Sequence, residues 1–242
     1  MQNKFNGSNS YMPSRRNNFV LESFKHFSIE KARKAQSLLA KKVLTKDLVH
    51  KPLRFIAGVD VAYFGSYSIG AVAILDIESK KTVEMETKVQ KTMFPYIPTL
   101  LSFREIPPAV SAIRKLKIKP DVYLVDGHGR AHPYKCGFAS HLGLVIDAPT
   151  IGVAKKILCG EVHKRLGANW NPLVLDGEII GAEVYTKEGS KPVYVSIGHM
   201  VSLDTAIRIV LQCSMDHRIP KPILEAHRAA NQERERLKSL LI

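Results

Sequence analysis

The sequence has few cysteines and no long apolar run. Its 242 residues include three scattered cysteines, Cys136, Cys159 and Cys213. An odd number of cysteines without a Cys-x-x-Cys pair argues against a disulfide framework and against a zinc site, and favours a reducing compartment. No apolar stretch approaches the roughly 18 residues of a transmembrane helix, and the N-terminus lacks the apolar core of a secretory signal. We therefore expect a cytoplasmic protein without a membrane partner.

Acidic residues are few relative to basic ones. The chain has 36 lysines and arginines against 22 aspartates and glutamates, which gives a formal net charge of +14. A surface with this excess attracts polyanions, so nucleic acid or an anionic membrane surface is the natural class of partner. A basic protein without such a partner is the alternative that charge alone leaves open.

The chain divides into a basic tail and one long patterned segment. Residues 1–23 are rich in Asn, Ser and Arg and have almost no apolar pattern, which is typical of a disordered tail. Residues 24–242 contain no internal repeat and no linker, and their length can bury a full core, so we expect a single domain there. Ser28 can cap a first helix. The predicted core-facing residues of that helix are Ala32, Ala35, Leu38 and Leu39.

Apolar patterning predicts three strands first and then an alternation of helices and strands. The first strands, at 55–62, 68–76 and 82–90, are joined by short turns as in a meander. The pair Pro107-Pro108 is expected to start or break the helix that follows them. The other predicted strands are 122–126, 150–153, 178–185 and 193–196, and the predicted helices are 98–116, 137–147, 202–213 and 222–241. This order indicates an α/β fold, a mixed central sheet flanked by helices on both faces.

The run Asp-Gly-His-Gly-Arg-Ala-His-Pro that begins at Asp126 predicts a binding site. Asp126 ends a buried strand, and ligands of α/β folds lie at the carboxyl ends of strands. Gly127 lets the backbone approach a bound group, and histidines titrate near neutral pH. The run therefore indicates a metal or phosphate site. His128, His132 and the nearby His141 lack a zinc pattern, and each alone is more often a structural histidine than a ligand.

Three carboxylates on separate predicted elements suit a hard divalent cation. Asp60 lies inside an otherwise apolar strand, where an unpaired carboxylate is costly, Glu105 lies on a predicted helix, and Asp126 ends a strand. Mg²⁺ prefers carboxylate oxygens and keeps waters and phosphate oxygens as its other ligands. The alternatives are a hydrogen-bonded core acid at position 60 and a surface pair of Glu105 with Arg104 or Lys115.

Lys155 and Tyr96 are candidates for contacts with nucleic acid. Lys155 follows an apolar strand, where its ammonium group can meet a phosphate, and a solvated pair with Lys156 is the alternative. Tyr96 stands between two prolines, and an aromatic side chain held in this way predicts a rigid wedge that unstacks bases. An ordinary proline-framed turn with a half-buried tyrosine fits the same residues.

Several segments, taken in order, resemble the endonuclease V family. They are GVDV at 58–61, PYIP at 95–98, LSFRE at 101–105, DGHG at 126–129, AHP at 131–133, ASHLG at 139–143, PTIGVAK at 149–155, VYVS at 193–196 and GH at 198–199. Each segment alone is weak evidence, but their number and order make a specific signal. The resemblance covers roughly residues 31–229.

The resemblance implies a ribonuclease H-like fold with a mixed five-stranded central sheet. It implies a DNA repair endonuclease that recognises deoxyinosine, which is deaminated deoxyadenosine, and hydrolyses the second phosphodiester bond on the 3′ side. The products would carry 3′-hydroxyl and 5′-phosphate ends, and the cofactor would be Mg²⁺, with Mn²⁺ as a substitute. Some members prefer inosine in RNA, and the motifs do not separate these substrates. We expect a monomer.

The resemblance also implies roles for individual acidic and basic residues. Asp60 and Asp126 would bind the metal, and Glu105 would complete the acidic site directly or through water. His227 matches a position that would join the metal environment. Lys155 would contact the region of the scissile phosphate. These five residues form the expected catalytic set.

Other residues would handle the damaged base. Tyr96 would separate the strands, and His132 is expected to contact a phosphate or a residue of the site. Backbone near Leu101, Gly127 and Phe138 would form the pocket, because a base must leave the stack to be inspected. Hypoxanthine carries a carbonyl where adenine carries an amine. A backbone N–H, that of Gly127 in particular, would therefore accept hypoxanthine and reject adenine.

Two departures from the family pattern bear on these roles. Tyr134 and Lys135 stand where the family often has two arginines, so a bidentate phosphate contact is lost or replaced by the point charge of a lysine. Residues 1–23 have no counterpart, and residues after 229 match poorly. Two rival interpretations are a non-catalytic nucleic-acid-binding module and a metal-dependent nuclease of another specificity on the same fold.

Overall fold

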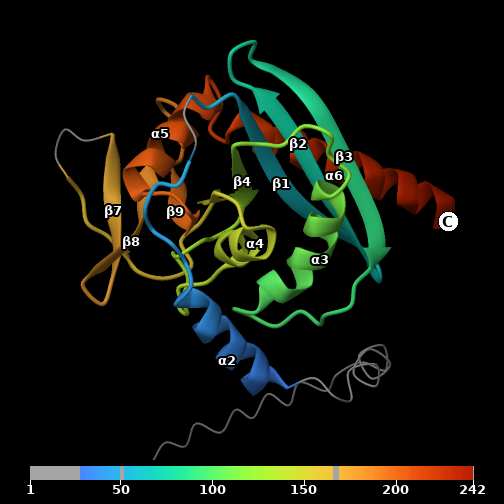
Figure 1. The fold of residues 1–242 in the computed structure, drawn as a ribbon, viewed down its shortest axis with the longest axis horizontal. Coiled ribbons are helices and arrows are strands. Elements are labelled where there is room, and N and C mark those ends of the chain that lie inside the picture. Colours follow the sequence, from blue (N-terminus) through green and yellow to red (C-terminus); the bar gives the residue numbers. More distant parts are fainter. Residues whose placement is uncertain (1–27, 50–51, 166–168, 242) are drawn as a thin grey trace, which may run out of the picture.

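The computed structural model describes residues 28–49, 52–165 and 169–241 (Figure 1). The helices are α2 (Ile29–Ala40), α3 (Leu101–Ile113), α4 (Phe138–Ile146), α5 (Leu203–Ser214) and α6 (Lys221–Leu241). The strands are β1 (Phe55–Phe64), β2 (Tyr67–Asp76), β3 (Lys81–Lys91), β4 (Val122–Asp126), β5 (Thr150–Ala154), β6 (Glu161–Val162), β7 (Trp170–Leu175), β8 (Glu178–Val184) and β9 (Val193–His199). The predicted tail, residues 1–23, lies outside the described residues. None of the described helices is long and apolar enough to cross a membrane.

Nine strands form one mixed sheet in the order β3-β2-β1-β4-β5-β9-β8-β7-β6. The pairs β1–β4 and β4–β5 are parallel, whereas β1–β2, β2–β3 and β5–β9 are antiparallel. The predicted mixed sheet is confirmed. The five strands that the resemblance implies correspond to the end formed by β3, β2, β1, β4 and β5, and four further strands extend the sheet beyond β5.

The sequence does not predict β6 and β7. β7 contains Pro172, and a proline inside an apolar run argues against a strand. The structure tolerates this proline near the edge of the sheet, where β7 pairs with the two-residue strand β6. The carbonyl of Pro172 still accepts a hydrogen bond from the N–H of His163 at 3.0 Å, so only the donor is lost.

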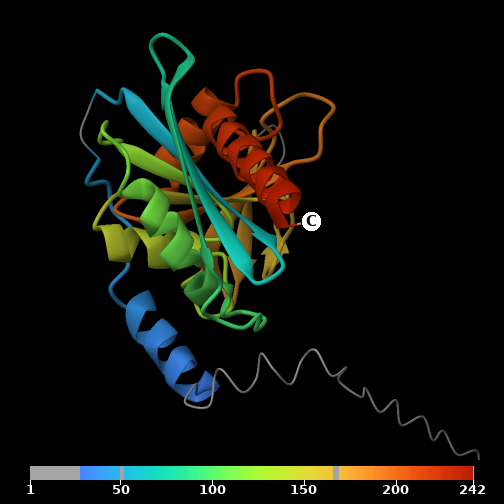
Figure 2. The same ribbon diagram turned by 90° about the vertical axis from the view of Figure 1, so that its right-hand side faces the viewer.

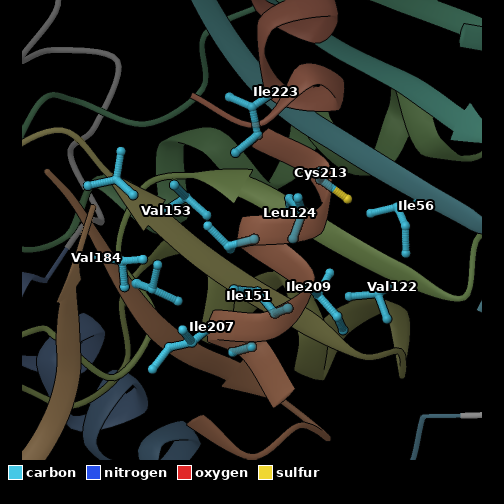
Figure 3. Packing of buried hydrophobic residues seen from close by; sticks show 14 of the residues in the cluster. Ile56, Val122, Leu124, Ile151, Val153, Val184, Ile207, Ile209, Cys213 and Ile223 are labelled. Atoms are coloured by element: carbon cyan, nitrogen blue, oxygen red, sulfur yellow. The ribbon is translucent and has the colours of Figure 1, made fainter. Parts of the chain in front are cut away.

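Helices cover both faces of the sheet (Figure 2). Successive residues of a strand point to opposite faces, so Ile56 and Ala57 of β1 belong to different cores. Ile56 packs in the core that includes Ile209 of α5 and a residue of α6 (Figure 3), and Ala57 packs in the core beneath α3 and α4. The same alternation turns Asp60 and Asp126 towards the α6 side.

Two glycines let α6 and α3 lie directly on the sheet. A Cβ atom at Gly58 would be 2.0 Å from the carbonyl of Pro222 in α6, and a Cβ atom at Gly70 would be 2.0 Å from the carbonyl oxygen of Pro108 in α3. These neighbours are helix backbone, which cannot shift as a flexible side chain can. The two glycines therefore set how closely α6 and α3 pass over the strands next to the acidic residues.

Two helices differ in detail from the prediction. The expectation that Pro107-Pro108 starts or breaks a helix is wrong, because α3 begins at Leu101 and contains both prolines. In α2 the predicted cap is confirmed, since Ser28 Oγ accepts a hydrogen bond from Lys31 N at 3.2 Å. Leu38 was expected in the core but is 52% exposed, whereas Gln36 is 1% exposed. Hydrogen bonds of Gln36, rather than an apolar stripe through Leu38, decide which face of α2 is buried.

Candidate active site

Asp60 and Asp126 lie side by side because of the register of two parallel strands. β1 pairs with β4 so that Val59 is opposite Val125, and the next residue of each strand is an aspartate. Asp60 is 9% exposed, and its Oδ1 accepts the N–H of Val61 at 2.8 Å. Both carboxylates therefore emerge at the same level of the sheet, one residue beyond the last apolar pair of this ladder.

His227 of α6 completes a cluster with the two aspartates. Its Nδ1 lies 2.7 Å from Asp60 Oδ2. One ligand atom from each of Asp60, Asp126 and His227 lies within 4.8 Å of the other two, which is close enough for one cation to contact all three. Gly58 makes this meeting possible, because the start of α6 rests on it.

Lys155 reaches the same centre from β5. β5 is parallel to β4, with Val153 opposite Asp126, and Lys155 follows the last residue of β5. Its Nζ lies 2.6 Å from Asp126 Oδ2, and 44% of its side chain is exposed. The ammonium group therefore neutralises Asp126 while it stays accessible to a ligand, so the alternative of a merely solvated lysine pair does not describe Lys155.

Negative charge is concentrated at this centre. Burial and repulsion from Asp60 and Asp126 raise the pKa of Glu105 well above its usual range. Burial and the Asp60 charge raise the pKa of Asp126, and Lys155 and His227 act in the opposite direction. Acids this close ionise together only when a cation compensates their charge.

The donor set fits a divalent metal ion. Two carboxylates and an imidazole converge on one point, and carboxylate oxygens are the ligands that Mg²⁺ and Mn²⁺ prefer. Glu105 interacts electrostatically with both aspartates but is not one of the three convergent groups. Its expected role as a metal ligand stays a prediction. The arrangement fits a metal-dependent hydrolase of phosphate esters.

A cleft of about 440 Å³ opens beside Asp126. Its lining consists of two segments, 126–128 at the end of β4 and 154–158 after β5. The second segment adds Lys155, Lys156 and the half-exposed apolar side chains of Ile157 and Leu158. Positive charge next to apolar surface suits a nucleotide, whose phosphate and base need different partners.

The residues expected to form the lesion pocket lie at the starts of two packed helices. Leu101 is the first residue of α3 and Phe138 is the first residue of α4. The two helix starts are joined by Ser102 Oγ and His141 Nδ1, which are 3.1 Å apart. A Cβ atom at Gly127 would lie 3.4 Å from the ring of Phe138, so Gly127 adjoins the same wall. The structure therefore brings Gly127 and Phe138 together and places Leu101 on the neighbouring helix.

The N–H of Gly127 is already used within the protein. It donates to Val153 O at 3.2 Å, so reading a base through this group would require that bond to break. At the start of α4 the N–H groups of Gly137 and Ala139 already donate to Gly129 O at 2.9 Å and to His128 O at 3.0 Å, so those of Phe138 and Ser140 are the ones left for a ligand. The first N–H groups of a helix have no partner within the helix.

Tyr96 projects from the loop between β3 and α3. It is 70% exposed, and Met93 beside it is 72% exposed. The base of the loop is held, because the rings of Phe94 and Phe103 stack with centroids 5.5 Å apart and Arg104 donates to Phe94 O at 3.1 Å. The structure thus has the exposed aromatic of the wedge hypothesis rather than the half-buried tyrosine of the alternative.

The histidines near the motif are largely internal. His132 is 5% exposed, and burial lowers its pKa to about 4, so the ring is neutral at physiological pH. Burial also lowers the pKa of His141 to about 4. His128 Nε2 lies 3.0 Å from Lys156 O. His132 is thus placed inside the protein, and the expected phosphate contact stays a prediction.

Comparisons with known proteins confirm the resemblance to the endonuclease V family. The model of the family described as Endonuclease V matches residues 37–228. The chain belongs to this family. An Endonuclease V of Thermofilum pendens is 47% identical over 207 residues, which cover 84% of this chain and 87% of that protein. One of Trichormus variabilis is 44% identical over 209 residues, which cover 84% of this chain and 94% of the other.

Solved endonuclease V structures share the fold. The structure from Streptomyces avermitilis has a TM-score of 0.82 and 34% identity, and the match covers 89% of this chain and 95% of the other. The structure from Ciona intestinalis, in complex with a 24mer DNA containing an inosine followed by a ribo-adenosine, has a TM-score of 0.79 and 30% identity over 86% of this chain and 98% of the other. As a member of the endonuclease V family, the chain is a nuclease and therefore a hydrolase.

The sequence did not reveal the polar residues that hold the segments before α3 and α4 in place. Gln36 donates to the carbonyls of Thr99 and Cys136, each at 2.8 Å. The guanidinium carbon of Arg104 lies 4.5 Å from the ring centre of Tyr63. The sequence contained no local signal for these contacts, because the partners are far apart in the chain. For Arg104 the only clue was its place next to Glu105.

Proposed function

We propose that this protein is a metal-dependent DNA repair endonuclease that recognises deoxyinosine. It hydrolyses the second phosphodiester bond 3′ to the lesion and leaves 3′-hydroxyl and 5′-phosphate ends. The observation that carries the proposal is the convergence of Asp60, Asp126 and His227 on one point in a chain of the endonuclease V family. The Ciona relative with inosine-containing DNA supports the choice of lesion, and the net charge of +14 supports a nucleic acid substrate.

Mg²⁺, with Mn²⁺ as a substitute, is the cofactor that we propose. Asp60, Asp126 and His227 would hold it, and Glu105 would complete the acidic site directly or through a water. When bound, the ion neutralises charge on the phosphate and makes a water easier to deprotonate. Glu105 has a raised pKa and suits a group that takes up the proton of the attacking water. Lys155 would exchange its contact with Asp126 for one with the scissile phosphate.

Tyr96 and the starts of α3 and α4 would select the base. Taking a base out of the duplex costs a few kcal/mol, and less for a mismatched base, and an exposed ring such as Tyr96 can fill the gap. Leu101, Gly127 and Phe138 would line the pocket. The N–H groups of Phe138 and Ser140 at the start of α4 would match the carbonyl oxygen of hypoxanthine. The amino group of adenine would face the same donors and leave them unpaired, which disfavours the undamaged base.

Inosine in RNA is the second candidate substrate. The DNA in complex with the Ciona relative contains an inosine followed by a ribo-adenosine. In that complex a 2′-hydroxyl is therefore present on the 3′ side of the inosine. An inosine-specific endoribonuclease would use the same acidic centre and the same pocket.

Cleavage of defined oligonucleotides tests the proposal. Purified protein is incubated with Mg²⁺ and with labelled DNA or RNA that carries one deoxyinosine or one inosine, and with matched strands that carry adenine. We expect lesion-dependent cleavage at the second bond on the 3′ side, and Asp126→Asn should abolish the product while largely retaining binding. A folded wild-type protein that yields no product would contradict the proposal. Cleavage of the adenine control at equal rate would indicate a nuclease of another specificity.

A further inference from the structure

Thr99 has a backbone conformation that a threonine rarely adopts. Its φ is 69°, in the left-handed region where a β-branched side chain is strained. Such strain persists only where the surroundings hold the residue in place. Thr99 lies three residues after Tyr96 and two residues before Leu101. Its backbone therefore fixes how the exposed ring and one pocket wall are presented.

Two side chains distant in sequence hold Thr99 in place. Gln36 Nε2 donates to Thr99 O at 2.8 Å, and an amino group of Arg33 donates to Thr99 Oγ1 at 3.2 Å. The backbone of Thr99 also lies near the buried imidazole of His132 and counteracts the lowering of its pKa by burial. Nδ1 of this imidazole accepts the N–H of Tyr134 at 3.2 Å.

The same two residues of α2 hold a second turn. Gln36 Nε2 donates to Cys136 O at 2.8 Å. Arg33 donates to the hydroxyl of Tyr134, and its guanidinium carbon lies 5.0 Å from the centre of that ring. Cys136 precedes Phe138 by two residues, just as Thr99 precedes Leu101. One buried amide thus ties together two points that are each two residues from a wall of the lesion pocket.

We propose that Gln36 and Arg33 form a brace that sets the separation of the Leu101 and Phe138 walls and thereby the selectivity for the damaged base. The brace rests on the proposed function of that pocket. Its residues are positioning residues, because their described contacts are to the two turns. Gln36 is 1% exposed, so water cannot replace its two hydrogen bonds. Ala32 and Gln36 are the buried residues of the described α2, which makes polar contacts rather than a broad apolar face the link between α2 and the pocket.

The test replaces Gln36 by methionine, which has a similar length and no donor. Ser37→Ala, at the exposed neighbouring position, is the matched control. A labelled deoxyinosine duplex is cleaved in the presence of increasing unlabelled undamaged duplex, which yields kcat, KM for the lesion and Ki for undamaged DNA. For Gln36→Met we expect KM to rise about tenfold while Ki stays unchanged, because the walls would then have to be ordered when the damaged base binds, at the expense of binding energy of about one hydrogen bond. Ser37→Ala should match the wild type.

Other outcomes separate the brace from a structural role and from the proposed function. A role in folding alone would reduce the active fraction, and hence kcat, while the ratio of KM to Ki stayed constant. That result for Gln36→Met overturns the brace. If Gln36→Met does not fold, Arg33→Lys, which keeps the charge but loses the guanidinium, should raise the same ratio, and an unchanged ratio overturns the proposal. A wild-type protein with equal KM and Ki would instead contradict the proposed function.

Discussion

Several charges of the site act on Asp126. Its burial and the neighbouring Asp60 disfavour the ionised form and raise its pKa, and Lys155 and His227 stabilise that form. The closest of these partners is Lys155, whose Nζ is 2.6 Å from Asp126 Oδ2. In the absence of a metal the ammonium group is therefore the nearest compensating charge, and under the proposed function it would become available to a phosphate when a cation took its place.

Lys155→Met should lower the cleavage rate much more than Lys156→Met. The first variant removes the charge beside Asp126 and the contact proposed for the scissile phosphate, and a charge-assisted hydrogen bond of this kind is worth about tenfold to a hundredfold in rate. Lys156 contacts His128 through its carbonyl, which the substitution leaves in place. Single-turnover cleavage of a deoxyinosine duplex measures both variants. Equal rates for the two variants would contradict the role of Lys155.

Glu105 should make the metal-free protein less stable as the pH rises. Its pKa is raised in the folded state, so the folded state binds the proton more tightly than the unfolded chain. The contribution of this proton to stability is complete below the unfolded pKa of about 4.3 and is lost as the pH rises through the folded pKa. Glu105→Gln, which has no charge to lose, should flatten this decline. Part of the decline should remain in this variant, because the pKa of Asp126 is also raised.

Thermal unfolding of the chelated protein between about pH 4 and about pH 9 measures this effect. Glu188→Gln, at an exposed position, is the control and should keep the wild-type slope. Added Mg²⁺ should raise the midpoint at neutral pH more in the wild type than in Glu105→Gln. The lowered pKa values of the buried His132 and His141 make the fold more stable as the pH rises through the lower part of this range, so the test is the comparison of variants. Equal pH slopes for the wild type and Glu105→Gln would show that folding does not destabilise the Glu105 carboxylate.

At the scale of elements, the centre depends on how closely helices pass over the sheet. α6 carries His227 and begins over Gly58 of β1, and α3 carries Glu105 and passes over Gly70 of β2. β1 and β4 set the aspartates side by side through their parallel register. The catalytic geometry is therefore a consequence of sheet register and of glycines under the two helices.

Gly58→Ala should mainly lower stability, whereas Gly127→Ala should leave the fold stable and lower lesion cleavage. A Cβ at Gly58 meets α6 backbone at 2.0 Å, whereas a Cβ at Gly127 meets the Phe138 ring at 3.4 Å. We expect Gly58→Ala to destabilise the fold by about 3 kcal/mol or more, because helix backbone must move, and to displace His227. Gly127→Ala should fold and should weaken lesion cleavage. Urea unfolding and cleavage assays measure the two effects, and a stable, fully active Gly58→Ala protein would contradict the packing argument.

The elements that sequence predicted are those with a local signal. The strands 55–62 and 122–126 and the cap at Ser28 follow from apolar runs and a capping residue, and the structure confirms them. Strand β7 was missed because Pro172 argues against a strand everywhere except near an edge. The burial of Gln36 was missed because its partners are 63 and 100 residues away. Side-chain hydrogen bonds to distant backbone leave no periodic pattern in the sequence.

The site shows the same division between local and distant signals. Asp126 was predicted from its place at the end of a buried strand, and its neighbour Asp60 from the cost of an acid among apolar residues. His227 came only from the family resemblance, because nothing in the sequence around it indicates that α6 begins over β1. The convergence of these three groups depends on register and helix placement, which a single sequence does not specify locally.

At the scale of the whole molecule, the charge of the body is opposite to the charge of the centre. The chain carries +14, whereas Asp60, Glu105 and Asp126 concentrate negative charge next to the cleft. The basic surface attracts the DNA backbone at long range, and the acidic centre tolerates a phosphate only when a cation is present. Under the proposed function, attraction to DNA in general and selection of the lesion would therefore be separate properties, carried by different residues.

If different residues attract DNA and select the lesion, substitutions in the two groups should change the salt dependence of DNA affinity differently. Affinity for undamaged duplex should fall linearly on a log–log plot against salt concentration, with a slope of about −0.9 for each phosphate that the protein neutralises. Lys155→Met should reduce the magnitude of this slope by about 1, because one cation is lost near the DNA backbone. Gln36→Met should keep the wild-type slope, because the brace contacts no phosphate. Filter binding or fluorescence anisotropy across a salt series measures both slopes.

Two outcomes would contradict these expectations. A reduced slope in Gln36→Met would mean that α2 acts on the DNA backbone rather than on the pocket. An unchanged slope in Lys155→Met would mean that the ammonium group of Lys155 stays with Asp126 when DNA binds.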